Sequence, residues 1–177
     1  MDPAKLSAVL ADHANWLTDH ATGRAAVLAG VDLSGVKLRK VDLTGANLAG
    51  ANLTGANIAA ATLTAANLSG ANLSNADLMG ADLSHADLSR ATLTNTKLFG
   101  ANLTGINLTE AKLRRAILTA ANLSDANLTD ADLAGADLRD AILSGVNLTA
   151  CKLTGADLTD AVIYPGWHIK STVEHFT

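Results

Sequence analysis

Every fifth residue from Leu28 to Ile163 is Leu or Ile, and this period constrains the fold more than any other feature of the chain. The register holds through 28 positions, of which 26 are Leu and two are Ile. A period of five fits neither the 3.6-residue period of an α-helix nor the uninterrupted two-residue alternation of a β-strand. The chain must therefore turn once in every five residues.

The repeating unit carries a small residue two positions before each Leu or Ile, and this residue is Ala in 21 of the 28 units. The exceptions are Val31, Val36, Val41, Thr96, Ile106, Val146 and Cys151. The small residue, the next residue and the Leu alternate inward, outward and inward as in an extended segment, and the last two residues form a corner. Gly ends 12 of the 28 units, whereas others end in residues such as Lys40 and His85. The sequence therefore predicts two corner geometries.

Stacked coils of this kind bury Leu on Leu and Ala on Ala, while their backbone groups pair at a spacing of about 4.8 Å. Aromatic residues make up only 3% of the chain, which argues against an ordinary globular core of large and varied side chains. The sequence predicts an all-β solenoid.

The unit resembles the consensus of the pentapeptide-repeat family, which is Ala, then Asp or Asn, then Leu, then two variable residues. The resemblance runs from Ala26 to Ile163. It implies a right-handed quadrilateral β-helix with four units per coil, which gives about seven coils and a rod about 34 Å long. We expect an N-terminal helical cap over residues 1–25, the β-helix over 26–163, and a C-terminal cap or contact segment over 164–177.

The N-terminal segment is expected to form a helix that covers the first coil. Asp2 and Pro3 are typical of a helix start, and Gly23 is a suitable end for the segment. One helical stripe carries Leu6, Val9, Leu10, His13, Trp16 and Leu17. The run from His13 to Leu17 resembles a His-x-x-Trp-Leu run that precedes the first coil in some bacterial members of the family.

The C-terminal segment breaks the period and supplies apolar groups to cover the last coil. These groups are Tyr164, Trp167, Ile169 and Phe176. The preferred interpretation is a cap. The alternative is a homodimer contact, because family members that act on topoisomerases pair through their C-terminal ends.

If each coil has four units, residues twenty apart are neighbours on one side of the rod. One side then carries outward apolar residues at Ala59, Met79, Phe99 and Ile117, which we predict to form a partner-binding patch. The alternatives are incidental exposure and cover by a terminal segment.

The same side carries a cluster of four carboxylates near the C-terminal end, namely Asp137, Asp140, Asp157 and Asp160. Carboxylates so spaced could hold a hard cation through their oxygen atoms. Because Arg139 already offers a counter-charge, a solvated face is the preferred interpretation, and we expect no metal or cofactor.

Charge and composition restrict the classes of function. The formal charge of −4 comes with no continuous basic stripe and almost no exposed aromatic residues to stack bases, so direct nucleic-acid binding is not expected. No segment has the length of a membrane span, and no leader is evident, which predicts a cytoplasmic protein. The single cysteine, Cys151, excludes an intrachain disulfide and stands at an inward position, where a buried structural thiol is predicted.

No catalytic residue is expected. Ser and Thr recur at nearly every corner, so none is distinguished as a nucleophile, and no histidine pairs with Cys151 at a recognisable spacing. The leading hypothesis is a non-enzymatic protein-interaction or scaffolding solenoid, either monomeric or dimerised through its C-terminus.

Two other hypotheses stay open. The first is a DNA mimic that acts on DNA gyrase or topoisomerase, as quinolone-resistance members of the family do, because acidic residues prevail on two sides of the rod. They are Asp87, Glu110 and Asp130 on one side and Asp42, Asp82 and Asp125 on the next. The second is that the protein has no specific partner.

Overall fold

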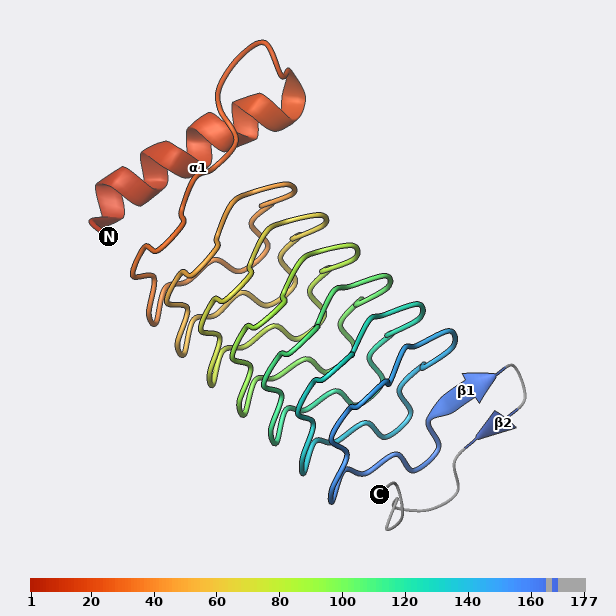
Figure 1. The fold of residues 1–177 in the computed structure, drawn as a ribbon. Helices are drawn as coiled ribbons and strands as arrows, with labels where there is room; N and C mark the ends of the chain where they lie inside the picture. Colours follow the sequence, from red (N-terminus) through yellow and green to blue (C-terminus); the bar gives the residue numbers. More distant parts are fainter. Residues whose placement is uncertain (165–166, 169–177) are drawn as a thin grey trace.

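The computed structural model describes residues 1–164 and 167–168, and it shows a helix at one end of a stack of coils (Figure 1). Helix α1 spans Pro3–Thr18, and two short strands, β1 (Val162–Tyr164) and β2 (Trp167–His168), follow the last coil. β1 pairs with β2 in the antiparallel sense. Among the described residues, no helix is long and apolar enough to cross a membrane.

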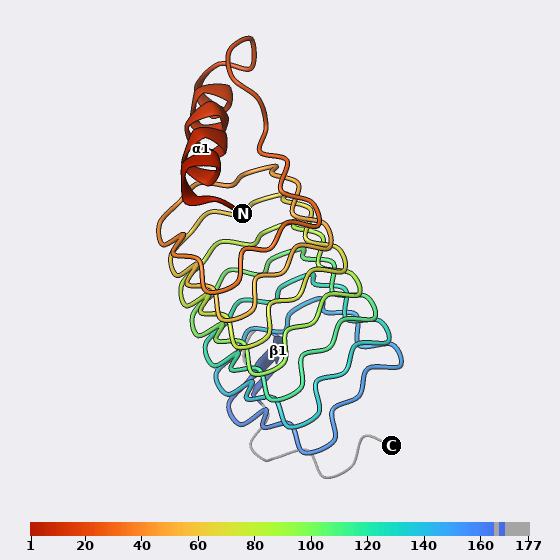
Figure 2. The same ribbon diagram turned by 90° about the vertical axis from the view of Figure 1, so that its left-hand side faces the viewer.

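Parallel bridges join each coil to the next at a spacing of twenty residues, from Val27 with Asn47 to Ile142 with Val162. Four units therefore make one coil, and in Figure 2 the successive coils lie over one another. The N–H group of each inward Leu or Ile from Leu28 to Leu143 donates to the next coil, as Leu28 does to the Asn47 carbonyl at 2.7 Å. The chain is thus a β-helix solenoid with an N-terminal helix, while the right-handed sense and a total of about seven coils stay predictions.

The interior is filled by the Leu and small-residue positions of the unit, almost all of which are buried. Two of the exceptions to Ala lie in the middle of the stack. Ile106 is buried among apolar neighbours, and Thr96 is also buried, but its Oγ1 donates to the Leu73 carbonyl at 2.8 Å. The hydroxyl group is therefore satisfied inside an apolar core.

The prediction of two corner geometries is wrong. The last residue of every unit from Gly30 to Asp160 has a positive φ, which is 62–71° for Gly and 54–61° for the other residues. The next N–H donates to the Leu carbonyl in the same way at both kinds of corner, as Val31 does to Leu28 at 3.2 Å and Val41 to Leu38 at 3.3 Å. The ladder between coils imposes one corner, and a non-glycine residue accepts it at a cost of about 1 kcal/mol.

The outward Asn and Asp residues recur because they stabilise the corners. Their Oδ1 atoms accept the N–H group of the second residue along, as Asn52 does from Thr54 at 3.2 Å and Asp77 from Met79 at 3.1 Å. A Ser or Thr at that second position also donates its hydroxyl to the same oxygen, at 2.7 Å for Thr54. These Asx turns account for the polar repeat without any ligand.

Candidate protein-interaction surface

The candidate site is one side of the rod, which we call the Phe99 side. Its bridge-paired column runs Lys37, Asn57, Asp77, Lys97, Ile117, Asp137 and Asp157. In each of these seven rungs, the two residues after the inward Leu or Ile complete the outward surface. Since adjacent rungs lie about 4.8 Å apart, the column is about 29 Å long.

The middle of the Phe99 side is apolar. Met79, Phe99 and Ile117 stand on three consecutive rungs and are 43%, 48% and 39% exposed. Ala59 lies one rung before Met79 and is buried. Its small side chain therefore adds little to the exposed apolar surface. The fold thus brings the four predicted patch residues onto one side. A hollow is lined by Arg39, Asn57, Ala59, Ala60, Asp77, Met79, Gly80, Phe99 and Gly100.

The first rung of the Phe99 side is basic. Lys37, Arg39 and Lys40 are all exposed and give this end of the side a charge of +3. Within residues 1–164 and 167–168, no carboxylate lies within ion-pair distance of these three side chains. Their charge is therefore directed to solvent or to a partner.

The last two rungs of the Phe99 side are acidic. Arg139 donates to Asp137 through two nitrogens, at 2.9 Å from Nε and 2.7 Å from Nη2, and its Nε lies 3.8 Å from Asp157 Oδ2. The hydrogen bond from Arg139 lowers the pKa of Asp137 to about 2. With Asp140 and Asp160 included, the last two rungs carry four carboxylates and one guanidinium.

This geometry disfavours the cation hypothesis. The guanidinium of Arg139 already binds two of the carboxylates that a cation would need. In the part of the chain that the structure describes, no group of three or more His, Cys, Asp or Glu side chains is arranged to hold a metal ion. The four carboxylates therefore form a charged end of the Phe99 side.

The sequence matches the family model described as "Pentapeptide repeats" in eight copies, over residues 26–64, 56–95, 96–133 and 121–160. The chain belongs to the pentapeptide repeat family. A search of curated protein sequences found no significant match.

Two solved structures show how this pentapeptide-repeat chain compares with others. HetL, a pentapeptide repeat protein involved in heterocyst differentiation regulation from the cyanobacterium Nostoc sp. strain PCC 7120, is 34% identical, with a TM-score of 0.69. The match covers 82% of this chain and 76% of HetL. A trypsin-treated form of QnrB1, a plasmid-mediated fluoroquinolone resistance protein, is 20% identical, with a TM-score of 0.56 over 76% of this chain and 71% of QnrB1. The likeness to QnrB1 shows the fold alone.

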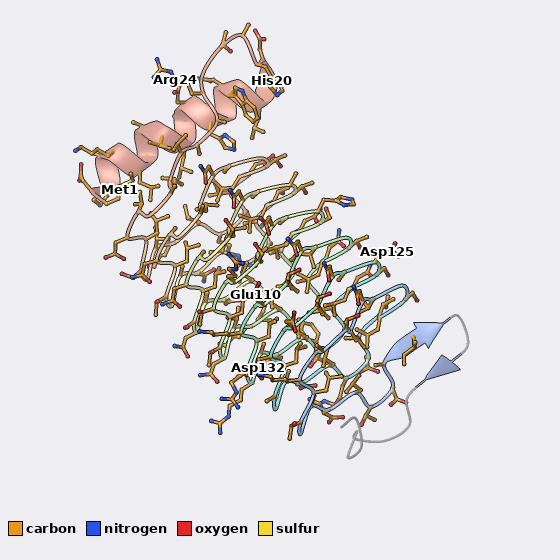
Figure 3. The ribbon with its side chains drawn as sticks, viewed as in Figure 1. Met1, His20, Arg24, Glu110, Asp125 and Asp132 are labelled. Carbon is orange, nitrogen blue, oxygen red and sulfur yellow. The ribbon has the colours of Figure 1, made fainter. Side chains whose placement is uncertain are left out.

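Helix α1 of this pentapeptide-repeat protein places the predicted cap residues against the first coil. Leu6 and His13 are buried, Val9 and Leu10 pack against the core, and Trp16 and Leu17 are half-buried. In Figure 3, Met1 lies at the start of the helix and His20 and Arg24 lie near its far end. The helix is therefore positioned to cover the coil, although the boundary at residue 25 stays a prediction.

His13 ties the cap to the β-helix. Its Nδ1 accepts the Ala26 N–H group at 3.1 Å, and its ring stacks on Trp16 with centroids 5.5 Å apart. Burial lowers the pKa of His13, against the opposing effect of the Asp42 charge. The neutral imidazole thus fits this site, with Nδ1 as the acceptor.

The C-terminal end departs from the sequence prediction. Leu148 is 37% exposed and Cys151 is half-buried, so the prediction of a buried thiol is wrong. In the described part of the chain, the bridge column beside Leu148 ends at Asn147, so no further bridged coil covers this corner. Burial still raises the pKa of Cys151 to about 11, and the charge of Asp132 adds to the effect.

The predicted C-terminal contact residues divide into two groups. The backbones of Tyr164 and Trp167 lie in β1 and β2 and face each other in the pairing. Ile169 and Phe176 lie outside the described residues. A cap or dimer contact formed by this segment stays a prediction.

Proposed function

We propose that the protein is a non-enzymatic interaction module that binds a protein partner through the Phe99 side. The observation that carries this proposal is the exposure of Met79, Phe99 and Ile117 on three consecutive rungs. The other exposed large apolar residues of the described chain lie toward its two ends, at Met1, Val27, Ile142 and Leu148. Apolar side chains that gather in mid-rod between charged ends are typical of a binding surface.

The chemistry of the candidate nucleophiles supports binding rather than catalysis. Corner hydroxyls such as those of Thr54 and Thr109 donate to the Asn side chain two residues before them, both at 2.7 Å. The pKa of about 11 keeps the Cys151 thiol protonated at neutral pH, and a thiol is a far weaker nucleophile than a thiolate. HetL is involved in heterocyst differentiation regulation, and we propose that this chain has a regulatory or scaffolding role that it performs through binding.

The caps and the compartment are part of the same proposal. We propose that two caps cover the ends of a β-helix at 26–163, one formed by residues 1–25 and the other by residues 164–177. The contacts of α1 with the core support the first of these caps. A single cysteine suits a reducing compartment, so we place the protein in the cytoplasm.

A capture experiment tests the Phe99 side. The double variant Met79→Ser/Phe99→Ser is expected to fold normally, because both side chains point outward and are exposed. Immobilised wild-type protein should retain a specific partner from an extract of the source cells, and the double variant should lose it. Val27→Ser is the matched control, since Val27 is an outward apolar residue on another side and is 67% exposed. Equal capture by wild type and double variant would count against the proposal.

A DNA mimic that acts on gyrase is the second candidate, favoured by the acidic residues on two sides of the rod. Part of that charge is neutralised, because Arg90 pairs with Glu110 at 3.2 Å. Figure 3 shows Glu110 and Asp125 among the outward side chains of the stack. A gyrase supercoiling assay at micromolar protein decides the matter: a change in supercoiling supports the mimic, and no effect rejects it.

A further inference from the structure

We propose that the Phe99 side binds a short acidic segment of a partner protein, which sets an apolar side chain beside Met79 and Phe99 and carboxylates against the basic first rung. The inference rests on the proposed function of the Phe99 side and names the chemistry of the partner. It is carried by one hollow that has a cationic wall at one end and an apolar wall at the other.

This hollow extends over the first four rungs of the Phe99 side. Arg39 lines it from the first rung, and Met79 and Phe99 line it from the third and fourth rungs. Most of the remaining lining has little or no side chain, at Ala59, Ala60, Gly80 and Gly100. The hollow therefore has room for side chains that come from a partner.

Two corner glycines keep the hollow open. A Cβ at Gly80 or Gly100 would have no heavy atom within 4 Å outside the adjacent residues, and both glycines have a φ of 62°. The chain accepts larger residues at such corners, since Asn75, His85 and Asn95 have φ angles of 57–59°. The fold would therefore accommodate a side chain at Gly80, and its absence leaves the space to a partner.

The charge around the hollow is positive. The first four rungs hold one carboxylate, Asp77, and four cations, Lys37, Arg39, Lys40 and Lys97. Within the described chain, none of these cations lies within ion-pair distance of a carboxylate. The whole protein has a formal charge of −4, so this surface departs from the rest of the molecule. An acidic partner is complementary to it.

Asp77 does not make the hollow acidic. Its Oδ1 accepts the Met79 N–H group at 3.1 Å, which is the same corner hydrogen bond that recurs along the rod. Lys97 stands on the next rung of the same column and offsets the charge of Asp77. The three cations of the first rung therefore set the charge at this end of the hollow.

The apolar wall favours a protein segment over a nucleic acid or an anionic membrane. Protein–nucleic acid interfaces are more polar and more positively charged than protein–protein interfaces. Here three of the four cations gather on the first rung, and Met79 and Phe99 stand on the third and fourth rungs. A segment that carries both carboxylates and an apolar side chain matches the two walls together.

A peptide selection tests the chemistry of the partner. The two walls lie two to three rungs apart, about 10–14 Å, so displayed random peptides of about ten residues can reach both. Selection on immobilised wild-type protein, with depletion on Met79→Ser/Phe99→Ser, should enrich peptides that combine Asp or Glu with a large apolar residue. Enriched peptides without an excess of acidic residues would overturn this inference and leave the proposed function in place. Failure to enrich any peptide would count against both.

Charge reversal tests the cationic wall. Lys37→Glu/Lys40→Glu should raise the Kd of the most enriched peptide at least about tenfold, because two favourable contacts become repulsive. The matched control is Lys112→Glu/Arg115→Glu, which makes the same change at a column position and a corner of another side. The same peptide with Lys in place of its acidic residues should prefer the Lys37→Glu/Lys40→Glu variant to the wild type. Equal Kd values for the two variants would reject the acidic partner.

Filling the hollow tests its role without any change in charge. Gly80→Asn places at this corner a residue type that Asn75 shows at a similar φ, and it should weaken peptide binding several-fold. Gly70→Asn is the matched control, because Gly70 also has open space around it and lies on another side. Circular dichroism verifies the fold of each variant, and equal Kd values for the two would overturn the proposal. A duplex oligonucleotide or phosphatidylserine vesicles that displace the peptide at lower concentration than the unlabelled peptide does would also overturn it.

Discussion

The two ends of the coil stack follow the same five-residue unit but bury it to different degrees. In the first coil, which lies beside helix α1, the leucines are all buried, while Val31, Val36 and Val41 at the small positions are half-buried. In the last described coil, Val146 and Cys151 are half-buried and Leu148 is 37% exposed. The small positions are therefore half-buried at both ends, and the difference lies in the Leu positions, which are buried beneath the cap and exposed at Leu148.

The largest expected effect on stability comes from comparing two leucines in one column. Leu88 is buried between coils, whereas Leu148 stands at the open end. Leu88→Ala is expected to lower the free energy of unfolding by about 2–5 kcal/mol, because it leaves a cavity that the neighbouring coils cannot fill. Leu148→Ala should lower it by less than about 1 kcal/mol. Urea denaturation measures both, and equal losses would show that Leu148 is covered in solution.

A pair of glycines tests how firmly the N-terminal cap is attached. Gly23 has a φ of 69°, and a Cβ there would meet the backbone oxygen of Asp12 and lie 2.7 Å from the Trp16 nitrogen. Gly30 has a similar φ of 66° but open space around it. We expect Gly23→Ala to destabilise the protein by about 2 kcal/mol or more and Gly30→Ala by about 1 kcal/mol. Equal effects in urea denaturation would mean that the contact between Gly23 and α1 contributes nothing.

The pH dependence of the cap depends on His13. Burial lowers the pKa of His13 below its ordinary value of 6.5, so the unfolded chain binds a proton more readily than the folded chain does. The stabilisation is complete above pH 6.5 and is lost as the pH falls toward the lower pKa of the folded state. Thermal unfolding at about pH 8 and about pH 5 should show a larger decrease in Tm for the wild type than for His13→Gln.

His13→Gln is a suitable comparison because the Gln oxygen can accept the Ala26 N–H group but does not titrate. The other histidines are unchanged in both proteins, so their contributions cancel. An identical decrease in Tm for the two proteins would exclude His13 as the source of the pH effect.

The smallest expected effect on stability concerns Cys151 at the C-terminal end. Cys151→Ala should change the free energy of unfolding by less than about 1 kcal/mol, because the thiol is only half-buried. With its pKa at about 11, the thiol should react with iodoacetamide roughly a hundredfold more slowly at neutral pH than the same chain in denaturant. Equal rates would show that this end of the stack is open to solvent.

The repeat predicted a solenoid, the family resemblance implied a β-helix, and the residues before the repeat predicted an N-terminal helix. The period of five can be read from short stretches of sequence, because each Leu must point inward. The apolar stripe from Leu6 to Leu17 can be read in the same way, because one face of the helix must be buried. The family match and helix α1 confirm the repeat solenoid and the N-terminal helix, while the cap formed by that helix stays a prediction. The Asx turns were missed, although Asn52 followed by Thr54 carries a signal that could have revealed them.

Other features could not be predicted from local sequence. The mixture of Gly and other residues at the corners suggested two geometries, but the hydrogen bonds between coils impose one φ on Gly30 and Lys40 alike. Leu148 obeys the repeat rule and is still exposed, because its burial depends on whether another coil or segment covers it. Burial of a repeat unit is therefore a property of its neighbours as much as of its own residues.

The sequence by itself determined that this chain turns every five residues, which side chains point inward, and that a helix precedes the first coil. The tertiary structure decided which outward residues become neighbours, because the twenty-residue spacing of the bridges depends on hydrogen bonds between coils. That spacing brings Met79 and Phe99 onto adjacent rungs, and it places Arg139 between the carboxylates of Asp137 and Asp157. The Phe99 side therefore exists only in the folded stack, where residues far apart in the sequence share one surface.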